Sequence, residues 1–173
     1  MIELILGGAR SGKSRYAEQS AQTLPAADFI YIATAQALDA EMSARIKHHR
    51  LTRDARWQTV EAPISLAQAL AQHSHKQSAV VVDCLTLWMT NLLLAGDDVF
   101  KRERTALLDA VPLLSGHVYV VSNETSMGIV PMDALSRRFV DETGRLHQQL
   151  AALSDRVTLV VAGIPMTIKP MTI

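Results

Sequence analysis

The chain has 173 residues, of which 49% are hydrophobic and 20% charged, a composition that excludes intrinsic disorder for most of its length. Lys plus Arg (17) equals Asp plus Glu (17), so no overall positive charge exists to attract nucleic acid or an anionic membrane. No apolar run approaches the roughly 18 residues of a membrane span, and residues 1–6 are too short for the core of a signal peptide. The lone cysteine, Cys84, cannot form an internal disulfide, so we expect a cytoplasmic protein.

Short apolar runs alternate with segments of helical periodicity along the chain. The runs cover 2–6, 29–33, 79–82, 118–121 and 157–162, and the helical segments cover 14–23, 39–50, 66–73, 86–94, 100–114 and 133–153. The runs are nearly continuous, which is typical of strands covered on both faces. The alternation predicts an α/β doubly wound domain with a mostly parallel sheet flanked by helices. The linker-like stretch 96–98 is too short to separate domains, so we expect a single domain over 1–173.

Functional loops of such a sheet follow the carboxyl ends of its strands, and here a distinctive motif follows the first run. Its residues are Gly7, Gly8, Ala9, Arg10, Ser11, Gly12, Lys13 and Ser14, which fit the pattern G-x-x-x-x-G-K-[ST]. The glycines let backbone N–H groups surround a polyphosphate, Lys13 reaches the terminal phosphates, and the Ser14 hydroxyl can bind Mg²⁺. The alternative is an ordinary glycine-rich turn. The motif predicts the fold of the P-loop NTPases, of the RecA-like type.

A P-loop enzyme also needs an acidic group near the metal, usually at the end of an apolar strand. Asp83 follows Val82 and fits that place. It could instead cap the helix that starts near Thr86. The neighbouring Cys84 is expected to be a small buried residue, because nothing around it suggests an activated thiol.

A histidine pair lies near the end of the helical segment 39–50. Met42, Ile46 and His49 fall on one apolar row, which leaves His48 on a different, more polar face beside Arg45. A neutral imidazole is a good nucleophile at pH 7, and neighbouring cations attract nucleotide phosphates. Paired histidines at a helix end can also simply cap carbonyls or face solvent. Adjacent positions diverge by about 100° on a helix, which argues against joint zinc ligation.

A third motif completes a recognisable set: N-E-x-x-M-G-I-V-P at residues 123–131, after R-I-x-H-H at 45–49 and the P-loop at 7–14. With these in this order, the sequence resembles the bifunctional adenosylcobinamide kinase/adenosylcobinamide-phosphate guanylyltransferase family of cobalamin biosynthesis, over essentially the whole chain. The chain departs from the family at Ser126, where a glycine is usual, and at His147, where asparagine is common.

The resemblance implies two reactions. The hydroxyl of adenosylcobinamide is phosphorylated by a nucleoside triphosphate, ATP or GTP, and GMP from GTP is then transferred through a histidine onto the new phosphate. It implies that His48 is the nucleophile and that the protein is a homo-oligomer, with a trimer expected. The P-loop pattern itself predicts that Ser14 and Asp83 hold Mg²⁺. The implied nucleotide contacts are residues 7–14, Ala33, Thr34, Ala35, Arg50, Leu51, Thr52, Arg53, Glu61 and Asp83. Without the resemblance, Glu61 would pass for an ordinary surface acid.

Two other functions use the same residues differently. A single-activity P-loop small-molecule kinase would employ Lys13, Ser14 and Asp83 but leave His48 idle. A non-catalytic nucleotide switch would form no covalent intermediate and would not depend on a corrinoid.

Overall fold

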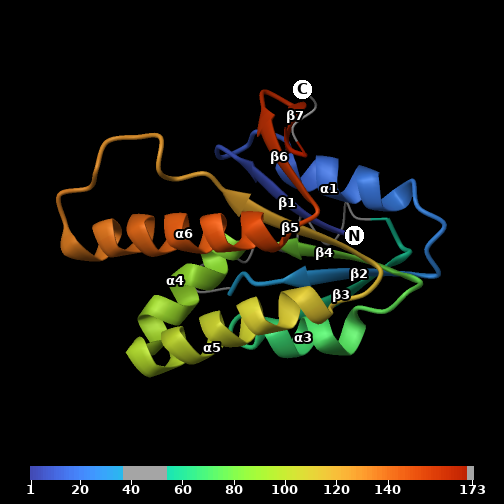
Figure 1. Ribbon diagram of the computed structural model, residues 1–173, viewed down its shortest axis with the longest axis horizontal. Coiled ribbons are helices and arrows are strands. Elements are labelled where there is room, and N and C mark those ends of the chain that lie inside the picture. Colours follow the sequence, from blue (N-terminus) through green and yellow to red (C-terminus); the bar gives the residue numbers. More distant parts are fainter. Residues whose placement is uncertain (37–53, 171–173) are drawn as a thin grey trace.

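The computed structural model describes residues 1–36 and 54–170. Within them a seven-stranded sheet has the order β3-β2-β4-β5-β1-β6-β7, as Figure 1 shows. The strands are β1 (Ile2–Gly7), β2 (Asp28–Ala33), β3 (Trp57–Glu61), β4 (Ser78–Asp83), β5 (His117–Asn123), β6 (Arg156–Val161) and β7 (Ile164–Lys169). All neighbours pair in parallel except β7, which runs antiparallel to β6. The predicted mostly parallel sheet is confirmed.

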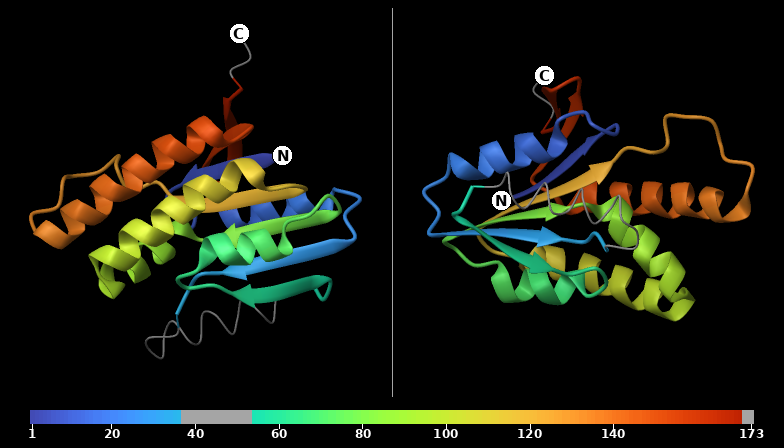
Figure 2. Two further views of the ribbon diagram at one scale, coloured as in Figure 1. Left: turned by 60° about the horizontal axis from the view of Figure 1, so that its bottom comes forward. Right: turned by 180° about the vertical axis from the view of Figure 1, so that it is seen from behind.

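Helices cover both faces of this sheet, as the two views of Figure 2 show. They are α1 (Lys13–Gln22), α3 (Leu66–His73), α4 (Leu85–Ala95), α5 (Asp97–Ala110) with a 3₁₀ turn η1 (Val111–Leu113), and α6 (Ala134–Leu153). The face under α1 packs side chains such as Ile5 and Val81, and the opposite face, under α3 to α6, packs Leu4 and Val80. Successive residues of a strand point to opposite faces, so a continuous apolar run is what two covered faces require.

Strands β3 and β7 were not predicted, because both are edge strands with incomplete cover. In β3, Trp57 is buried whereas Gln58 and Glu61 are exposed, so no continuous apolar run exists. In β7 the side chains are mostly exposed, and Pro165 breaks the strand signal. Proline lacks a backbone N–H and is tolerated on an edge strand.

The predicted limits of α5 were wrong at both ends. The helix begins at Asp97, so most of the stretch 96–98 belongs to its first turn. The carboxylates of Asp97 and Asp98 there interact favourably with the positive end of the helix dipole. The α-helix ends at Ala110, and Pro112 lies in the 3₁₀ turn that follows. The predicted helix 66–73 matches α3, and the segment 39–50 lies outside the described residues. No described helix combines the length and hydropathy that crossing a bilayer requires.

Candidate active site

The P-loop joins β1 to α1 at the carboxyl edge of the sheet, and its backbone path depends on glycine. Gly12 has φ +96°, and a Cβ there would lie 3.3 Å from the Cα of Gly163. At Gly7 a Cβ would collide with the backbone carbonyl of Val160. The N–H of Gly163 donates a 2.8 Å hydrogen bond to the carbonyl of Ser11. The turn between β6 and β7 therefore supports the P-loop from the side.

Sequence reasoning missed that turn, although a signal for it exists. Ala162 and Gly163 both have positive φ, 51° and 81°, which is the geometry of a tight two-residue hairpin turn. They separate the apolar strand β6 from Ile164, Met166 and Ile168, which alternate with other residues along β7. An alternating run after a glycine-containing dipeptide is typical of a hairpin.

The Lys13 ammonium group is held against the P-loop backbone. Its Nζ donates a 2.6 Å hydrogen bond to the carbonyl of Gly8 and lies 3.4 Å from Oγ of Ser11. Burial lowers the pKa of Lys13, and the negative field of Asp83 opposes that shift. The N–H groups at the start of α1 and a nearby cation provide the chemistry that binds polyphosphate.

Asp83 ends β4, which is separated from β1 by β5 alone. Its Oδ2 accepts a 2.6 Å hydrogen bond from the hydroxyl of Tyr31 on β2. The alternative role as a helix cap is not what the structure shows, because α4 begins at Leu85 with Cys84 at its N-cap and no side-chain cap bond. Tyr31 is a positioning partner that no local pattern singles out, because the two residues are far apart in the chain.

Ser14 and Asp83 suit Mg²⁺. Ser14 lies in the first turn of α1 directly after Lys13, the residue that experiences the field of Asp83. Among the described residues, no group of at least three His, Cys, Asp or Glu side chains forms a self-sufficient metal cage. Mg²⁺ typically takes one or two protein oxygens and completes its shell with water and phosphate oxygens. One hydroxyl and one carboxylate beside a P-loop fit that requirement.

Thr34 ties the ends of β2 and β4 together. Its buried hydroxyl donates a 2.7 Å hydrogen bond to the carbonyl of Cys84 and accepts one of 2.9 Å from the Cys84 N–H. Asn91 on α4 donates to the carbonyls of Thr34 (2.8 Å) and Pro63 (3.0 Å). Ala33 and Ala35 lie half-buried on either side. This tie fixes the carboxyl edge, and a nucleotide contact from residues 33–35 stays a prediction.

Cys84 is buried, as expected. Burial and the neighbouring carboxylate of Asp83 raise the pKa of its thiol, although a contact with Thr86 opposes the shift. A thiol that stays protonated is a poor nucleophile. Cys84 is therefore a packing residue in the described structure.

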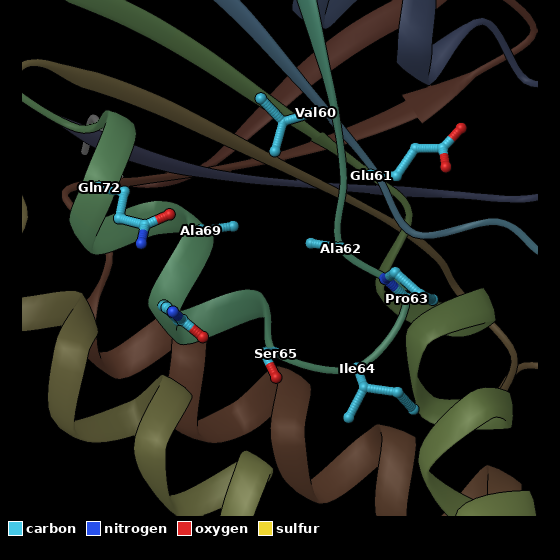
Figure 3. Close-up of a pocket in the computed structure, with 9 residues that line it drawn as sticks. Val60, Glu61, Ala62, Pro63, Ile64, Ser65, Ala69 and Gln72 are labelled. Atoms are coloured by element: carbon cyan, nitrogen blue, oxygen red, sulfur yellow. The ribbon is translucent and has the colours of Figure 1, made fainter.

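Glu61 is exposed at the end of β3, on the far side of β2, β4 and β5 from the P-loop strand. Figure 3 shows a cavity between the end of β3 and α3, lined by residues 60–65 and by Gln68, Ala69 and Gln72. The carboxyl group of Glu61 points away from α3 in this view. The structure thus does not bring Glu61 next to the P-loop, and its contact with nucleotide stays a prediction.

The end of β5 and the start of the N-E-x-x-M-G-I-V-P motif carry polar residues whose partners lie on other elements. Ser122 is buried and its Oγ lies 2.7 Å from Nε2 of His147 on α6. Asn123 donates a 3.0 Å hydrogen bond to the hydroxyl of Thr86. The N–H of Glu124 donates a 2.9 Å hydrogen bond to the carbonyl of Gly7. The segment after β5 is therefore attached directly to the first residue of the P-loop.

Other predicted site residues cannot be placed. His48, Arg50, Leu51, Thr52 and Arg53 lie outside the described residues. Their roles stay predictions from the resemblance.

Comparison with known proteins decides which P-loop family this site serves. The family model described as cobinamide kinase / cobinamide phosphate guanyltransferase matches residues 3–168. The chain belongs to this family. It is 52% identical over 170 residues to the bifunctional adenosylcobalamin biosynthesis protein CobP of Pseudomonas aeruginosa, covering 98% of each chain. It is 42% identical over 184 residues to the bifunctional protein CobU of Salmonella typhimurium, covering 98% of this chain and 100% of the relative.

Both relatives are named as bifunctional proteins, and the single-activity alternative finds no support among them. Solved structures agree with the P-loop fold. An ATPase from the type III secretion system of pathogenic bacteria gives a TM-score of 0.54 at 9% identity, over 96% of this chain and 56% of that one. A protein of Pyrococcus horikoshii OT3 gives 0.55 at 9% identity, over 99% and 87%. At this identity the likeness concerns the fold alone.

Proposed function

We propose that this chain phosphorylates the hydroxyl of adenosylcobinamide and then converts the product to adenosylcobinamide-GDP. The observation that carries the proposal is the P-loop with Lys13 held at its centre, in a chain of the cobinamide kinase / cobinamide phosphate guanyltransferase family. A single domain performs both reactions, because the P-loop, Asp83 and the segment after β5 share one edge of one sheet.

The kinase step uses the P-loop. The hydroxyl oxygen of the corrinoid attacks the γ-phosphorus of ATP or GTP, the bond to the β-phosphate bridging oxygen breaks, and the nucleoside diphosphate leaves while the hydroxyl proton is released. Lys13 and the N–H groups of residues 7–14 bind the phosphates and stabilise the charge that moves onto the leaving oxygen. Ser14 and Asp83 would hold Mg²⁺, which when bound would supply positive charge to neutralise the polyphosphate.

The guanylyltransferase step uses His48. One imidazole nitrogen attacks the α-phosphorus of GTP, the bond to the β-phosphate breaks, and pyrophosphate leaves. A phosphate oxygen of adenosylcobinamide phosphate then attacks the same phosphorus, the P–N bond breaks, and the histidine is regenerated. The nucleotide is contacted by Ala33, Thr34, Ala35, Arg50, Leu51, Thr52, Arg53 and Glu61, as the family resemblance implies.

The protein acts in the cytoplasm, where both nucleotides occur, and it is a homo-oligomer, with a trimer expected. Support for self-association comes from the exposed apolar side chains of the β6–β7 hairpin, Val161, Ile164, Met166 and Ile168. An edge strand with an apolar face is a surface that proteins usually cover.

The proposal is tested by supplying adenosylcobinamide, ATP, GTP and Mg²⁺ to the purified protein and identifying products by mass. We expect adenosylcobinamide phosphate first and adenosylcobinamide-GDP after it. Lys13→Ala should suppress both products, because it deletes the P-loop cation. The matched control is Lys76→Ala, which removes an exposed lysine from the turn before β4, at the opposite edge of the sheet. Equal rates in the two variants would refute the P-loop assignment.

A further inference from the structure

The segment between β5 and α6, residues 124–133, projects beyond the carboxyl edge of the sheet together with the first half of α6 (Figures 1 and 2). His147 on α6 contacts Ser122 at the end of β5. Because an α-helix rises 1.5 Å per residue, the part of α6 from Ala134 to His147 extends roughly 20 Å past this contact. We call residues 124–133 the β5–α6 loop.

The β5–α6 loop exposes an unusual amount of apolar surface. Ile129 is 97% exposed and Met132 is 96% exposed, and Met127 and Val130 are exposed as well. No charged side chain occurs between Glu124 and Asp133. Such a concentration of exposed apolar side chains usually marks a surface that binds something.

Hydrogen bonds within the loop hold this surface in place. The Glu124 carboxylate accepts from the N–H groups of Ser126 (3.0 Å) and Met127 (3.1 Å). The Arg137 guanidinium donates to the carbonyls of Pro131 and Met132, and Asp133 caps α6 through the N–H of Ser136. The apolar side chains point outward while the polar groups are used to fix the backbone.

The loop is also attached to the site of phosphoryl transfer. The N–H of Glu124 donates to the carbonyl of Gly7, the first P-loop residue, and Asn123 is the strand neighbour of Gly7. A molecule lying on the β5–α6 loop therefore reaches toward the nucleotide phosphates. The kinase reaction requires this placement of the acceptor, whose hydroxyl must meet the γ-phosphorus.

We propose that the β5–α6 loop binds the corrin macrocycle of the acceptor through Met127, Ile129, Val130 and Met132. The inference rests on the proposed function, because that function supplies a large acceptor with an apolar macrocyclic face and a hydroxyl at the end of an arm. Methionine is flexible and polarizable and adapts to an irregular apolar surface. The loop receives the macrocycle, and the arm carries the hydroxyl to the P-loop.

The test is equilibrium dialysis of cobinamide against the protein in the presence of a non-hydrolysable GTP analogue. The visible absorbance of cobinamide measures how much of it is bound. Removing two apolar contacts in the variant Ile129→Ser/Met132→Ser should weaken binding by about tenfold or more, with unchanged affinity for the analogue. The matched control is Leu113→Ser, since Leu113 is 83% exposed but lies in η1 before β5, at the other edge of the sheet. It should bind cobinamide as the wild type does.

Light scattering of the same samples tests whether a second copy of the chain, and not the corrinoid, covers the β5–α6 loop. A lower molecular mass of the loop variant would overturn the inference, because the surface would then serve self-association. Unchanged cobinamide affinity would overturn it too. Dialysis detects binding without turnover, so a wild type that binds cobinamide but does not phosphorylate it contradicts the proposed function alone. A wild type that binds no cobinamide contradicts both.

Discussion

The hydroxyl of Tyr31 donates a 2.6 Å hydrogen bond to the carboxylate of Asp83, and this contact joins β2 to the acidic end of β4. A hydrogen bond to a charged group contributes about 1.5–3 kcal/mol. Tyr31→Phe should therefore lower kcat by roughly tenfold, because the carboxylate loses an orienting partner. The control is Tyr16→Phe, which removes a 3.0 Å bond to the buried Glu3 under α1. Equal kcat values in the two folded variants would show that the Tyr31 contact is not used in catalysis.

Asp83 itself should govern the metal requirement. Asp83→Asn keeps the size of the side chain but replaces a charged oxygen by a neutral amide, which Mg²⁺ binds weakly. We expect the Mg²⁺ concentration at half-maximal rate to rise at least tenfold, and EDTA to stop the wild-type reaction. Rates are measured across a Mg²⁺ titration, with thermal unfolding as the check that the variant is folded. A titration curve superimposable on that of the wild type would remove Asp83 from the metal site.

Alanine substitution should be unfavourable at Gly12 and favourable at Gly144. At Gly12 the positive φ and the close Cα of Gly163 penalise a Cβ, so Gly12→Ala should weaken binding of fluorescent GTP by tenfold or more. Gly144 lies inside α6, where an added Cβ would meet nothing within 4 Å. Gly144→Ala should raise the free energy of unfolding by about 0.5–1 kcal/mol and leave GTP binding intact. Normal GTP affinity in the Gly12 variant would contradict the backbone argument.

The buried His147 should make stability depend on pH. Burial lowers the pKa of His147, although the Glu124 carboxylate opposes this. The unfolded chain, with a histidine pKa of about 6.5, therefore binds a proton at a higher pH than the folded chain does. The contribution of neutral His147 to the free energy of unfolding is therefore fully present above about pH 6.5, the pKa in the unfolded chain. It is lost as the pH falls toward the lower pKa of the folded chain.

Urea unfolding between pH 5 and pH 8 measures this effect. His147→Asn, which does not titrate, should show a shallower loss of stability below pH 6.5 than the wild type. Part of the loss remains in the variant, because burial lowers the pKa of His117 as well. Parallel curves for wild type and variant would mean that His147 titrates alike in the folded and unfolded chains.

The parts of the fold that the sequence predicted are those with a local signal. Strands β1, β2, β4, β5 and β6 are covered on both faces, so each is a continuous apolar run. Strands β3 and β7 lie at the edges and carry mixed residues, so periodicity did not identify them. The P-loop was recognisable because its backbone path restricts the residues that can occupy it.

The partners of the site residues could not be predicted in the same way. The contacts of Tyr31 with Asp83, Thr34 with Cys84, and Ser122 with His147 join residues that are distant in the chain. They depend on the strand order β3-β2-β4-β5-β1-β6-β7, which local patterns do not determine. The support of the P-loop by Gly163 arises in the same way, from the β6–β7 hairpin.

The central claim is that one histidine carries GMP between the two substrates. The most direct measurement incubates the protein with GTP labelled at the α-phosphate or at the γ-phosphate and counts the label that remains on the chain. The account predicts retention of the α-label alone, with release of pyrophosphate and a bond that is labile in acid, as expected of a phosphoramidate. His48→Ala should abolish the label and His49→Ala should retain it. Label retained by the His48 variant, or γ-label on the wild type, would contradict the account.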